Sequence, residues 1–310
     1  MVPGSGVQRR HGRQPAARRG DQGPSRFHRN DLRGVRIGAH VPTRGGLLSA
    51  IRAARECGAD AIQVFLSNPR AWAPPRISRK EADAFRQAWG ESGLGPMFVH
   101  APYVVNLASP VPEFLERSID VIRQAVAAAS SVGANGYVVH AGSGGPGEPA
   151  ESFRRAVSAL RAVPAEDDCD VVVELTAGTA GSVAATFPEA AHLFEAVGDP
   201  RLKLCADTCH LFAAGYALDE PDGVAACFEE LHASGLGDRL VLIHANDAKY
   251  ERGARRDRHE HIGQGGIGVE GFFEILHRPE VQELALVVET PGRLEDHARN
   301  IATLRRLAAD

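Results

Sequence analysis

The 310-residue sequence lacks any apolar run of about 18 residues or more, and no apolar segment follows the charged residues at its N-terminus. A membrane span or a secretory signal requires such a segment, so neither is predicted. The five cysteines are odd in number and include no C-x-x-C pair, which argues against a disulfide framework and against a thiolate zinc knuckle. We therefore expect a cytoplasmic protein without a membrane partner, whose cysteines are buried free thiols.

No G-x-G-x-x-G turn follows the first apolar segment, which disfavours a doubly wound dinucleotide-binding sheet. Short apolar segments alternate instead with amphipathic helical patterns. The predicted strands lie near residues 36–41, 61–66, 96–100, 135–140, 170–175, 202–207, 240–245 and 284–289. Eight strand and helix units over about 275 residues are typical of a (β/α)8 TIM barrel, so we predict a single such domain over residues 35–310.

Residues 1–34 are rich in Arg, Gly, Gln and Pro and show hardly any apolar periodicity, so we predict a disordered basic extension. Residues 1–35 carry a net charge of +6, which leaves −10 on the rest of a chain whose total is −4. The extension could hold DNA, act as a weak targeting signal or be a solvated tail, and its start codon could also be assigned too far upstream. The acidic body opposes an anionic substrate unless bound metal neutralises some of its carboxylates.

Six consecutive predicted strands, the third to the eighth, end in a metal-competent side chain. These residues are His100, His140, Glu174, Asp207, His244 and Glu289. In a parallel barrel all such strand ends lie on one face and converge on the barrel axis. Any one of them, Asp207 for example, is more often a loop cap or a satisfied polar group. Six in a row made only of His, Asp and Glu indicate a metal centre.

A further set of candidate ligands lies outside the strand ends. His210 follows Asp207 by three residues, and the long segment between the seventh and eighth strands contains Asp257 and His259. Residues two apart in an extended segment face the same side, so this pair could join His210 in another site. The same segment is basic, with Lys249, Arg252, Arg255, Arg256 and Arg258. Alone, such a run predicts a solvated loop, but here it opens onto the active face, where it would supply phosphate contacts.

Together these residues give nine candidate ligands, five histidines and four carboxylates, which is too many for one ion. Imidazole and carboxylate ligands without thiolate suit Zn²⁺, with Mn²⁺ or Fe²⁺ as possible substitutes. Three ions would share the set at three to four ligands each if one carboxylate bridges. Their combined charge of +6 would change the net charge of the acidic body from −10 to −4. It would also concentrate positive charge at the cleft.

The chain from Arg36 to Leu307 resembles the endonuclease IV family of apurinic/apyrimidinic (AP) endonucleases. The resemblance rests on Gly38-Ala39-His40-Val41, Val99-His100-Ala101-Pro102-Tyr103, Val139-His140-Ala141-Gly142-Ser143, Glu174-Leu175-Thr176-Ala177-Gly178, Asp207-Thr208-Cys209-His210, His244-Ala245-Asn246-Asp247-Ala248-Lys249, Asp257-Arg258-His259 and Glu289-Thr290. It implies a TIM barrel with a trinuclear zinc site at the C-terminal face of the strands. It also implies cleavage of DNA 5′ to an abasic site, which leaves a 3′-hydroxyl and a 5′-deoxyribose phosphate.

The family's ligand positions are all filled in this sequence. The resemblance implies a first zinc held by His100, His140 and Glu174, a second by Glu174, Asp207, His244 and Glu289, and a third by His210, Asp257 and His259. Glu174 and Glu289 are the implied catalytic residues, together with a hydroxide that bridges two ions. Zinc lowers the pKa of bound water from about 15.7 towards about 7, so no side-chain nucleophile is needed. The third ion would stabilise the leaving 3′-oxygen.

The resemblance also implies a wedge that enters the duplex at the lesion, formed by Arg70, Tyr103 and Val104. Lys249, Arg256 and Arg258 complete the expected DNA-binding residues. The implied partner is double-stranded DNA with abasic sites or 3′-blocked ends, bound by a monomer. Three positions depart from the family pattern: Val104 replaces a larger leucine, Leu175 an asparagine and Gln264 a glutamate. None is a ligand, so they affect pocket polarity and stacking rather than the reaction class.

Two alternatives have different chemistry. Sugar isomerases and epimerases of the xylose-isomerase-like barrels share the fold and a single-metal set equivalent to Glu174, Asp207, His244 and Glu289. The other five ligands have no task in a one-metal enzyme, whereas a three-metal phosphodiesterase needs them. The second alternative is a DNA-binding barrel without catalysis, which would be expected to lose ligands while it keeps the basic loops. In this sequence all nine candidate ligands are present. The sequence therefore favours the nuclease.

Overall fold

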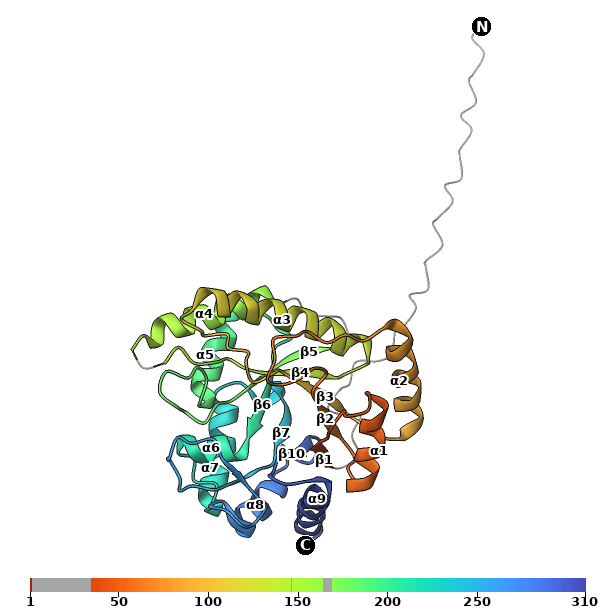
Figure 1. The fold of residues 1–310 in the computed structure, drawn as a ribbon. Helices are drawn as coiled ribbons and strands as arrows, with labels where there is room; N and C mark the ends of the chain where they lie inside the picture. The colour runs from red at the N-terminus through yellow and green to blue at the C-terminus, as the bar shows by residue number, and fades with distance from the viewer. Residues whose placement is uncertain (2–34, 146, 164–168) are drawn as a thin grey trace.

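Eight parallel strands form a closed barrel in the order β1-β10-β7-β6-β5-β4-β3-β2, as the computed structural model shows (Figure 1). The structure describes residue 1 and residues 35–145, 147–163 and 169–310. The strands of the barrel are β1 (Arg36–His40), β2 (Ile62–Val64), β3 (Met97–His100), β4 (Gly136–His140), β5 (Asp170–Glu174), β6 (Lys203–Asp207), β7 (Leu240–His244) and β10 (Ala285–Val288). The predicted TIM barrel is confirmed, and each predicted strand lies within two residues of its observed bounds.

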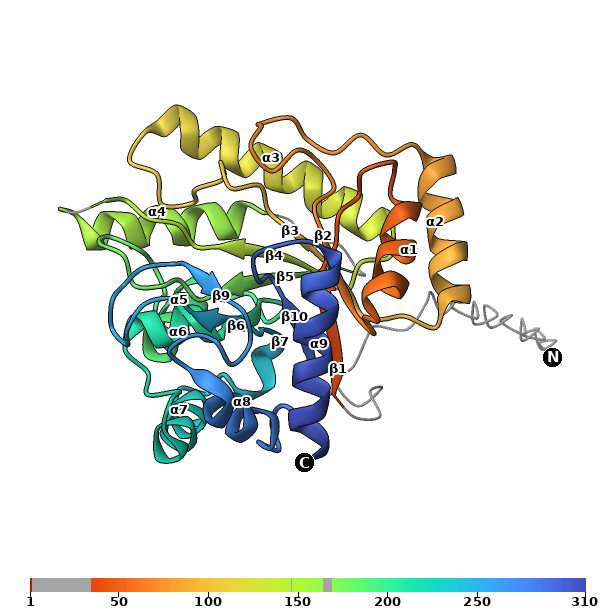
Figure 2. The same cartoon turned by 60° about the horizontal axis from the view of Figure 1, so that its bottom comes forward.

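The helices surround the barrel and connect its strands in sequence. They are α1 (Leu48–Cys57), α2 (Arg79–Ser92), α3 (Pro112–Ser131), α4 (Pro149–Ala162), α5 (Phe187–Val197), α6 (Thr208–Ala214), α7 (Pro221–Ala233), α8 (Gly268–Leu276) and α9 (Leu294–Ala309). The last helix, α9, packs beside α1 and β1 and so closes the ring (Figure 2). None of the described helices is long and apolar enough to cross a membrane.

The core has an inner and an outer layer, as the alternation of side chains along a strand requires. The inner cluster is formed by strand residues and a neighbouring alanine: Ala61, Phe98, Val138, Val172, Cys205, Leu242, Ala285 and Val287. The outer cluster combines the remaining strand side chains with the apolar faces of the helices. The barrel interior is therefore a packed core, and polar side chains gather at the strand ends.

Gly38 shows how closely β1 approaches β2. A Cβ atom at this position would lie 1.7 Å from the carbonyl oxygen of Ala61. No side chain larger than hydrogen can fit there without separating the two strands. The glycine thus brings the end of β1, including His40, close to β2.

A two-stranded hairpin interrupts the pattern between β7 and α8. Its strands are β8 (Asp247–Ala248) and β9 (His259–Glu260), and they pair in antiparallel orientation. The hairpin packs against the short helix α6 (Figure 2). The sequence predicts only a long basic segment here, because strands of two residues have no periodicity to detect. The predicted extension at residues 1–34 lies outside the described residues.

Candidate metal centre

A ring of polar side chains lines the C-terminal ends of the barrel strands. Each strand contributes one residue: His40, Gln63, His100, His140, Glu174, Asp207, His244 and, directly after β10, Glu289. The parallel register aligns them, with His140 opposite Glu174 and Asp207 opposite His244. All six strand-end residues singled out in the sequence therefore lie on one face of the barrel, as its geometry requires.

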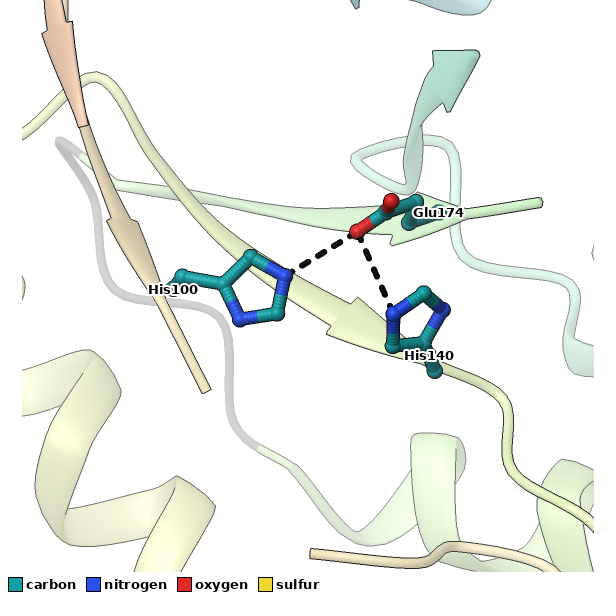
Figure 3. A group of neighbouring side chains, drawn as sticks. All are labelled: His100, His140 and Glu174. Atoms are coloured by element: carbon teal, nitrogen blue, oxygen red, sulfur yellow. Dashed lines mark hydrogen bonds and ion pairs between the residues drawn. The ribbon is translucent and has the colours of Figure 1, made fainter. Parts of the chain in front are cut away.

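The first group of candidate ligands consists of His100, His140 and Glu174, from β3, β4 and β5 (Figure 3). The Nε2 atoms of both histidines face the same carboxylate oxygen, Glu174 Oε2, at 3.0 Å for His100 and 3.5 Å for His140. His100 Nδ1 lies 2.8 Å from the carbonyl oxygen of Ala101, which can only accept a hydrogen bond. The proton of His100 therefore resides on Nδ1, and its Nε2 presents a lone pair to the group.

The second group combines Glu174 with Asp207, His244 and Glu289, and their ligand atoms lie within 4.8 Å of one another. His244 Nδ1 lies 3.0 Å from Glu174 Oε1, 3.3 Å from Glu289 Oε2 and 3.9 Å from Asp207 Oδ2. Asp207 and His244 are fully buried, so this group forms the floor of the centre. Because Glu174 uses Oε2 in the first group and Oε1 in the second, its carboxylate spans the two.

The third group contains His210, Asp257 and His259. Asp207 positions His210, because its Oδ1 accepts a hydrogen bond from the backbone N–H of His210 and thereby caps the N-terminus of α6. Strand β9 holds His259, and Asp257 precedes it by two residues. The side chain of Asp207 is thus a helix cap and also faces the ligand groups, since its Oδ2 lies 3.6 Å from His259 Nε2.

The third group combines residue types that can hold a metal ion. His210 Nδ1 and His259 Nδ1 lie 2.9 Å and 3.1 Å from the carbonyl oxygens of Leu175 and Glu289. Each Nδ1 therefore carries the proton, and each Nε2 has a lone pair. Both Nε2 atoms are buried without a hydrogen bond, although Asp257 Oδ1 lies 3.3 Å and 3.2 Å away. Such donors fit a divalent ion such as Zn²⁺, with Mn²⁺ or Fe²⁺ also suited to the ligand types.

The charges of the centre depend strongly on one another. Burial alone would raise the pKa of Glu174, but the surrounding histidines hold it well below its ordinary value. Burial would likewise lower the pKa of His210, yet the nearby Asp207 and Asp257 raise it well above its ordinary value. The carboxylates are thus kept ionised by positive charge around them, and a divalent cation supplies such charge.

Two cysteines also lie beside these groups, Cys205 near Glu174 and His244, and Cys209 near Asp207 and His259. Burial raises the pKa of both thiols to about 12. Burial thus favours the protonated thiol in the absence of a bound cation. All five cysteines are free and buried, as the sequence predicted.

A cavity of about 890 Å³ opens above the three groups. Its wall includes Arg70, Tyr103 and Arg258. The Tyr103 side chain is 70% exposed, and its backbone N–H donates to the carbonyl of Pro69, which joins the loops after β2 and β3. Val104 is half-buried and does not line this cavity, whereas Val105 does.

The basic residues of the hairpin differ in their surroundings. Lys249 and Arg256 are exposed, and the Arg256 guanidinium lies over the Tyr250 ring at 4.9 Å from its centroid. Arg252 instead forms ion pairs with Asp219 and Glu220. Lys249, Arg256 and Arg258 thus remain available at the surface of the active face, while the charge of Arg252 is already compensated.

The sequence analysis missed four residues that support the centre. His40 and Gln63 contact Glu289, and the amide of Asn246 contacts both Asp207 Oδ2 and the backbone N–H of Glu289. Asp247 is fully buried and accepts backbone hydrogen bonds from Ala248 and from four residues of the glycine-rich turn, Gly263, Gly265, Ile267 and Gly268. His40 lies next to the last residue of the predicted strand 36–41 and ends the observed strand β1, so the rule that selected the other histidines could have found it.

Comparison with known proteins first defines the class. Residues 51–307 match the family model described as "Xylose isomerase-like TIM barrel". Solved structures with this fold include 3-keto-D-glucoside 4-epimerase from E. coli, at a TM-score of 0.64 and 17% identity, covering 88% of this chain and 99% of that one. At this identity the likeness concerns the fold alone. The protein is thus a xylose isomerase-like TIM barrel with a polar cluster at its strand ends.

More similar relatives define the family. The "Probable endonuclease 4" of Streptomyces coelicolor is 40% identical over 278 residues, which cover 87% of this chain and 94% of the relative. That of Methanosphaerula palustris is 37% identical over 282 residues, covering 88% and 98%. The crystal structure of endonuclease IV from Thermus thermophilus superimposes with a TM-score of 0.79 at 33% identity, covering 88% and 99%. The chain belongs to the endonuclease IV family.

Proposed function

We propose that the protein is a zinc-dependent AP endonuclease that hydrolyses the phosphodiester bond 5′ to an abasic site in double-stranded DNA. The products would be a 3′-hydroxyl and a 5′-deoxyribose phosphate. The same centre would also trim blocked 3′ ends, because the bond broken is of the same type. Membership of the endonuclease IV family supports the reaction class.

The observation that carries the proposal is the presence of three adjoining ligand groups rather than one. A one-metal sugar epimerase needs only the second group, Glu174, Asp207, His244 and Glu289. It would leave the first and third groups, with five further ligands, without a task. A phosphodiesterase has to stabilise charge on both the attacking and the leaving oxygen, and multiple ions on one face can do so.

The residues of the chain would have distinct tasks. His100, His140 and Glu174 would hold one zinc ion, Glu174 with Asp207, His244 and Glu289 a second, and His210 with Asp257 and His259 a third. Bound zinc would lower the pKa of water and offset negative charge on the phosphate. Glu174 would fix the spacing of the first two sites, since its two oxygens face different groups.

The rim of the cavity would recognise the lesion. Arg70 and Tyr103 stand on loops joined by a backbone hydrogen bond, and with Val104 they would occupy the gap left by the missing base. Turning an abasic nucleotide out of the duplex costs less free energy than turning out a paired one, because no base pair has to be broken. Lys249, Arg256 and Arg258 would contact phosphates beside the lesion.

A duplex that carries a single tetrahydrofuran abasic analogue tests the proposal. We expect one cut, on the 5′ side of the analogue, with a 3′ end that a DNA polymerase can extend. A chelator should abolish cleavage and added zinc should restore it, while the undamaged duplex stays intact. An uncut analogue combined with metal-dependent epimerisation of a ketohexose would instead establish the sugar-epimerase alternative.

Metal content provides a second test. Elemental analysis of protein purified without chelator should find close to three divalent ions per chain, mostly zinc, because the nine ligands form three groups. A parallel sample dialysed against chelator and then against zinc should return to the same number. A single ion per chain would favour the one-metal epimerase.

A further inference from the structure

Gln63 occupies an unusual place in the polar ring, because it is a fully buried amide in the middle of β2. Its Nε2 lies 2.6 Å from Glu289 Oε1, and its Oε1 lies 3.0 Å from His244 Nε2. The amide therefore touches two members of the second group at once. Gln63 also lies 3.1 Å, through its Nε2, from His40 Nδ1.

The orientation of this amide is determined by its neighbours. A carboxylate oxygen only accepts hydrogen bonds, so the NH₂ group of Gln63 has to face Glu289. The amide oxygen then faces His244 Nε2, which has to donate. With its proton on Nε2, a neutral His244 leaves the Nδ1 lone pair directed at Glu174 Oε1 and Glu289 Oε2, at 3.0 Å and 3.3 Å.

His40 reinforces the arrangement on the side of Glu289. Its Nδ1 lies 3.0 Å from the same oxygen that accepts from Gln63, Glu289 Oε1. Gln63 Nε2 lies 3.1 Å from the same nitrogen, and because Glu289 Oε1 can only accept, a hydrogen bond between His40 and Glu289 requires the proton on His40 Nδ1. The ring of His40 is held against Phe65, with ring centroids 4.4 Å apart. Two donors thus occupy Oε1, and Oε2 is the oxygen of Glu289 that remains for the second group.

We propose that Gln63 is the positioning residue of the second metal site, and that it selects the Nδ1-ligating tautomer of His244 and the use of Glu289 through Oε2. His40 supports the second of these tasks. The inference rests on the proposed function, since it concerns a metal ion bound by that group. Residues that orient metal ligands in this way typically contribute about 10- to 100-fold to metal affinity.

The test measures zinc affinity site by site, by competition with a chromophoric chelator, in the wild type, Gln63→Met and His40→Phe. Methionine is similar to glutamine in shape but removes all three polar contacts of the amide, whereas phenylalanine at position 40 removes one donor and keeps an aromatic ring. We expect Gln63→Met to weaken one of three ions by about 10- to 100-fold and to leave two unchanged. His40→Phe should lower the affinity for one zinc ion by a smaller factor than Gln63→Met does. It also provides a test if Gln63→Met fails to fold.

Two controls separate positioning from general destabilisation. Ile122→Ala removes a buried side chain from the outer layer on α3 and should lower the melting temperature without changing any zinc affinity. Gln63→Met combined with His259→Ala should weaken the binding of two ions and leave the third unchanged, because the substitutions affect different groups. Wild-type affinity for all three ions in Gln63→Met, or uniform weakening of all three, would overturn the inference. A wild type that binds no zinc would instead refute the proposed function.

Discussion

Glu174 forms close charge contacts with four histidines among the candidate ligands. Its Oε2 faces His100 and His140, and its Oε1 faces His244 and His210. Glu174 is also only 1% exposed, so water cannot readily take over the contacts that its carboxylate makes. A change here should therefore affect the first two groups together, whereas a change at His259 should affect only the third.

Glu174→Ala should reduce cleavage of abasic DNA by at least about 10³-fold, because two metal sites lose their common ligand and several kcal/mol of charge stabilisation with it. Single-turnover cleavage together with elemental analysis would measure both effects. His259→Ala is the matched comparison and should mainly lower occupancy of one ion. Near-normal turnover in Glu174→Ala would show that the ligand assignment is wrong.

Tyr103 is expected to act on the DNA rather than on the metal, since it is highly exposed at the rim of the cavity. Tyr103→Ala should keep its ions but lose roughly ten- to hundredfold in kcat/KM on duplex abasic DNA, if stacking contributes about 1–3 kcal/mol. Removal of a 3′-phosphate should fall much less, because a terminus requires little distortion. Equal losses on both substrates, at unchanged metal content, would assign Tyr103 to the wall of the centre instead.

At the scale of elements, two glycines should respond in opposite directions to the same substitution. Gly90 lies inside helix α2 with open space around its Cβ position, so Gly90→Ala should raise the free energy of unfolding by about 0.5–1 kcal/mol. Gly38→Ala should lower it by about 3 kcal/mol or more, because the new methyl group would collide with the carbonyl of Ala61. Urea denaturation followed by circular dichroism measures both; a destabilised Gly90→Ala or a stable Gly38→Ala would contradict the packing described.

The strands and most of the ring could be predicted from the sequence because the rule behind them is local. An apolar run that ends in His, Asp or Glu identifies both the strand and the face on which its last residue lies. His100 and Glu174 are 74 residues apart, yet the barrel alone brings them together. The resemblance to a known family then supplied the division into three groups.

Gln63 and the β8–β9 hairpin could not be predicted in this way. Gln63 stands in the middle of an apolar run, and its importance depends on His244 and Glu289, 181 and 226 residues away. The hairpin depends on Asp247, whose carboxylate holds a turn that lies 16 to 21 residues further along the chain. Both features arise from tertiary contacts, which no local pattern of residues encodes.

For the whole molecule, the charge difference between the N-terminal residues and the body leads to a testable prediction. The composition of residues 1–34 cannot form a core, so deleting them should leave the melting temperature almost unchanged. If their positive charge contacts phosphates, the truncated protein should bind DNA with a shallower dependence on salt. Calorimetry and salt titrations of both forms would measure these effects, and a large loss of thermal stability would show that the segment packs on the barrel.

The distribution of ligands over the strands also has a consequence for synthesis. The second group takes residues from β5, β6 and β7, and it is completed only by Glu289, which follows the last strand of the barrel. A chain that is still emerging from the ribosome therefore has an incomplete group, however well its earlier strands have folded. Any chemistry that needs the complete second group therefore becomes available only after the last strand of the barrel has been made and Glu289 has joined the other three residues.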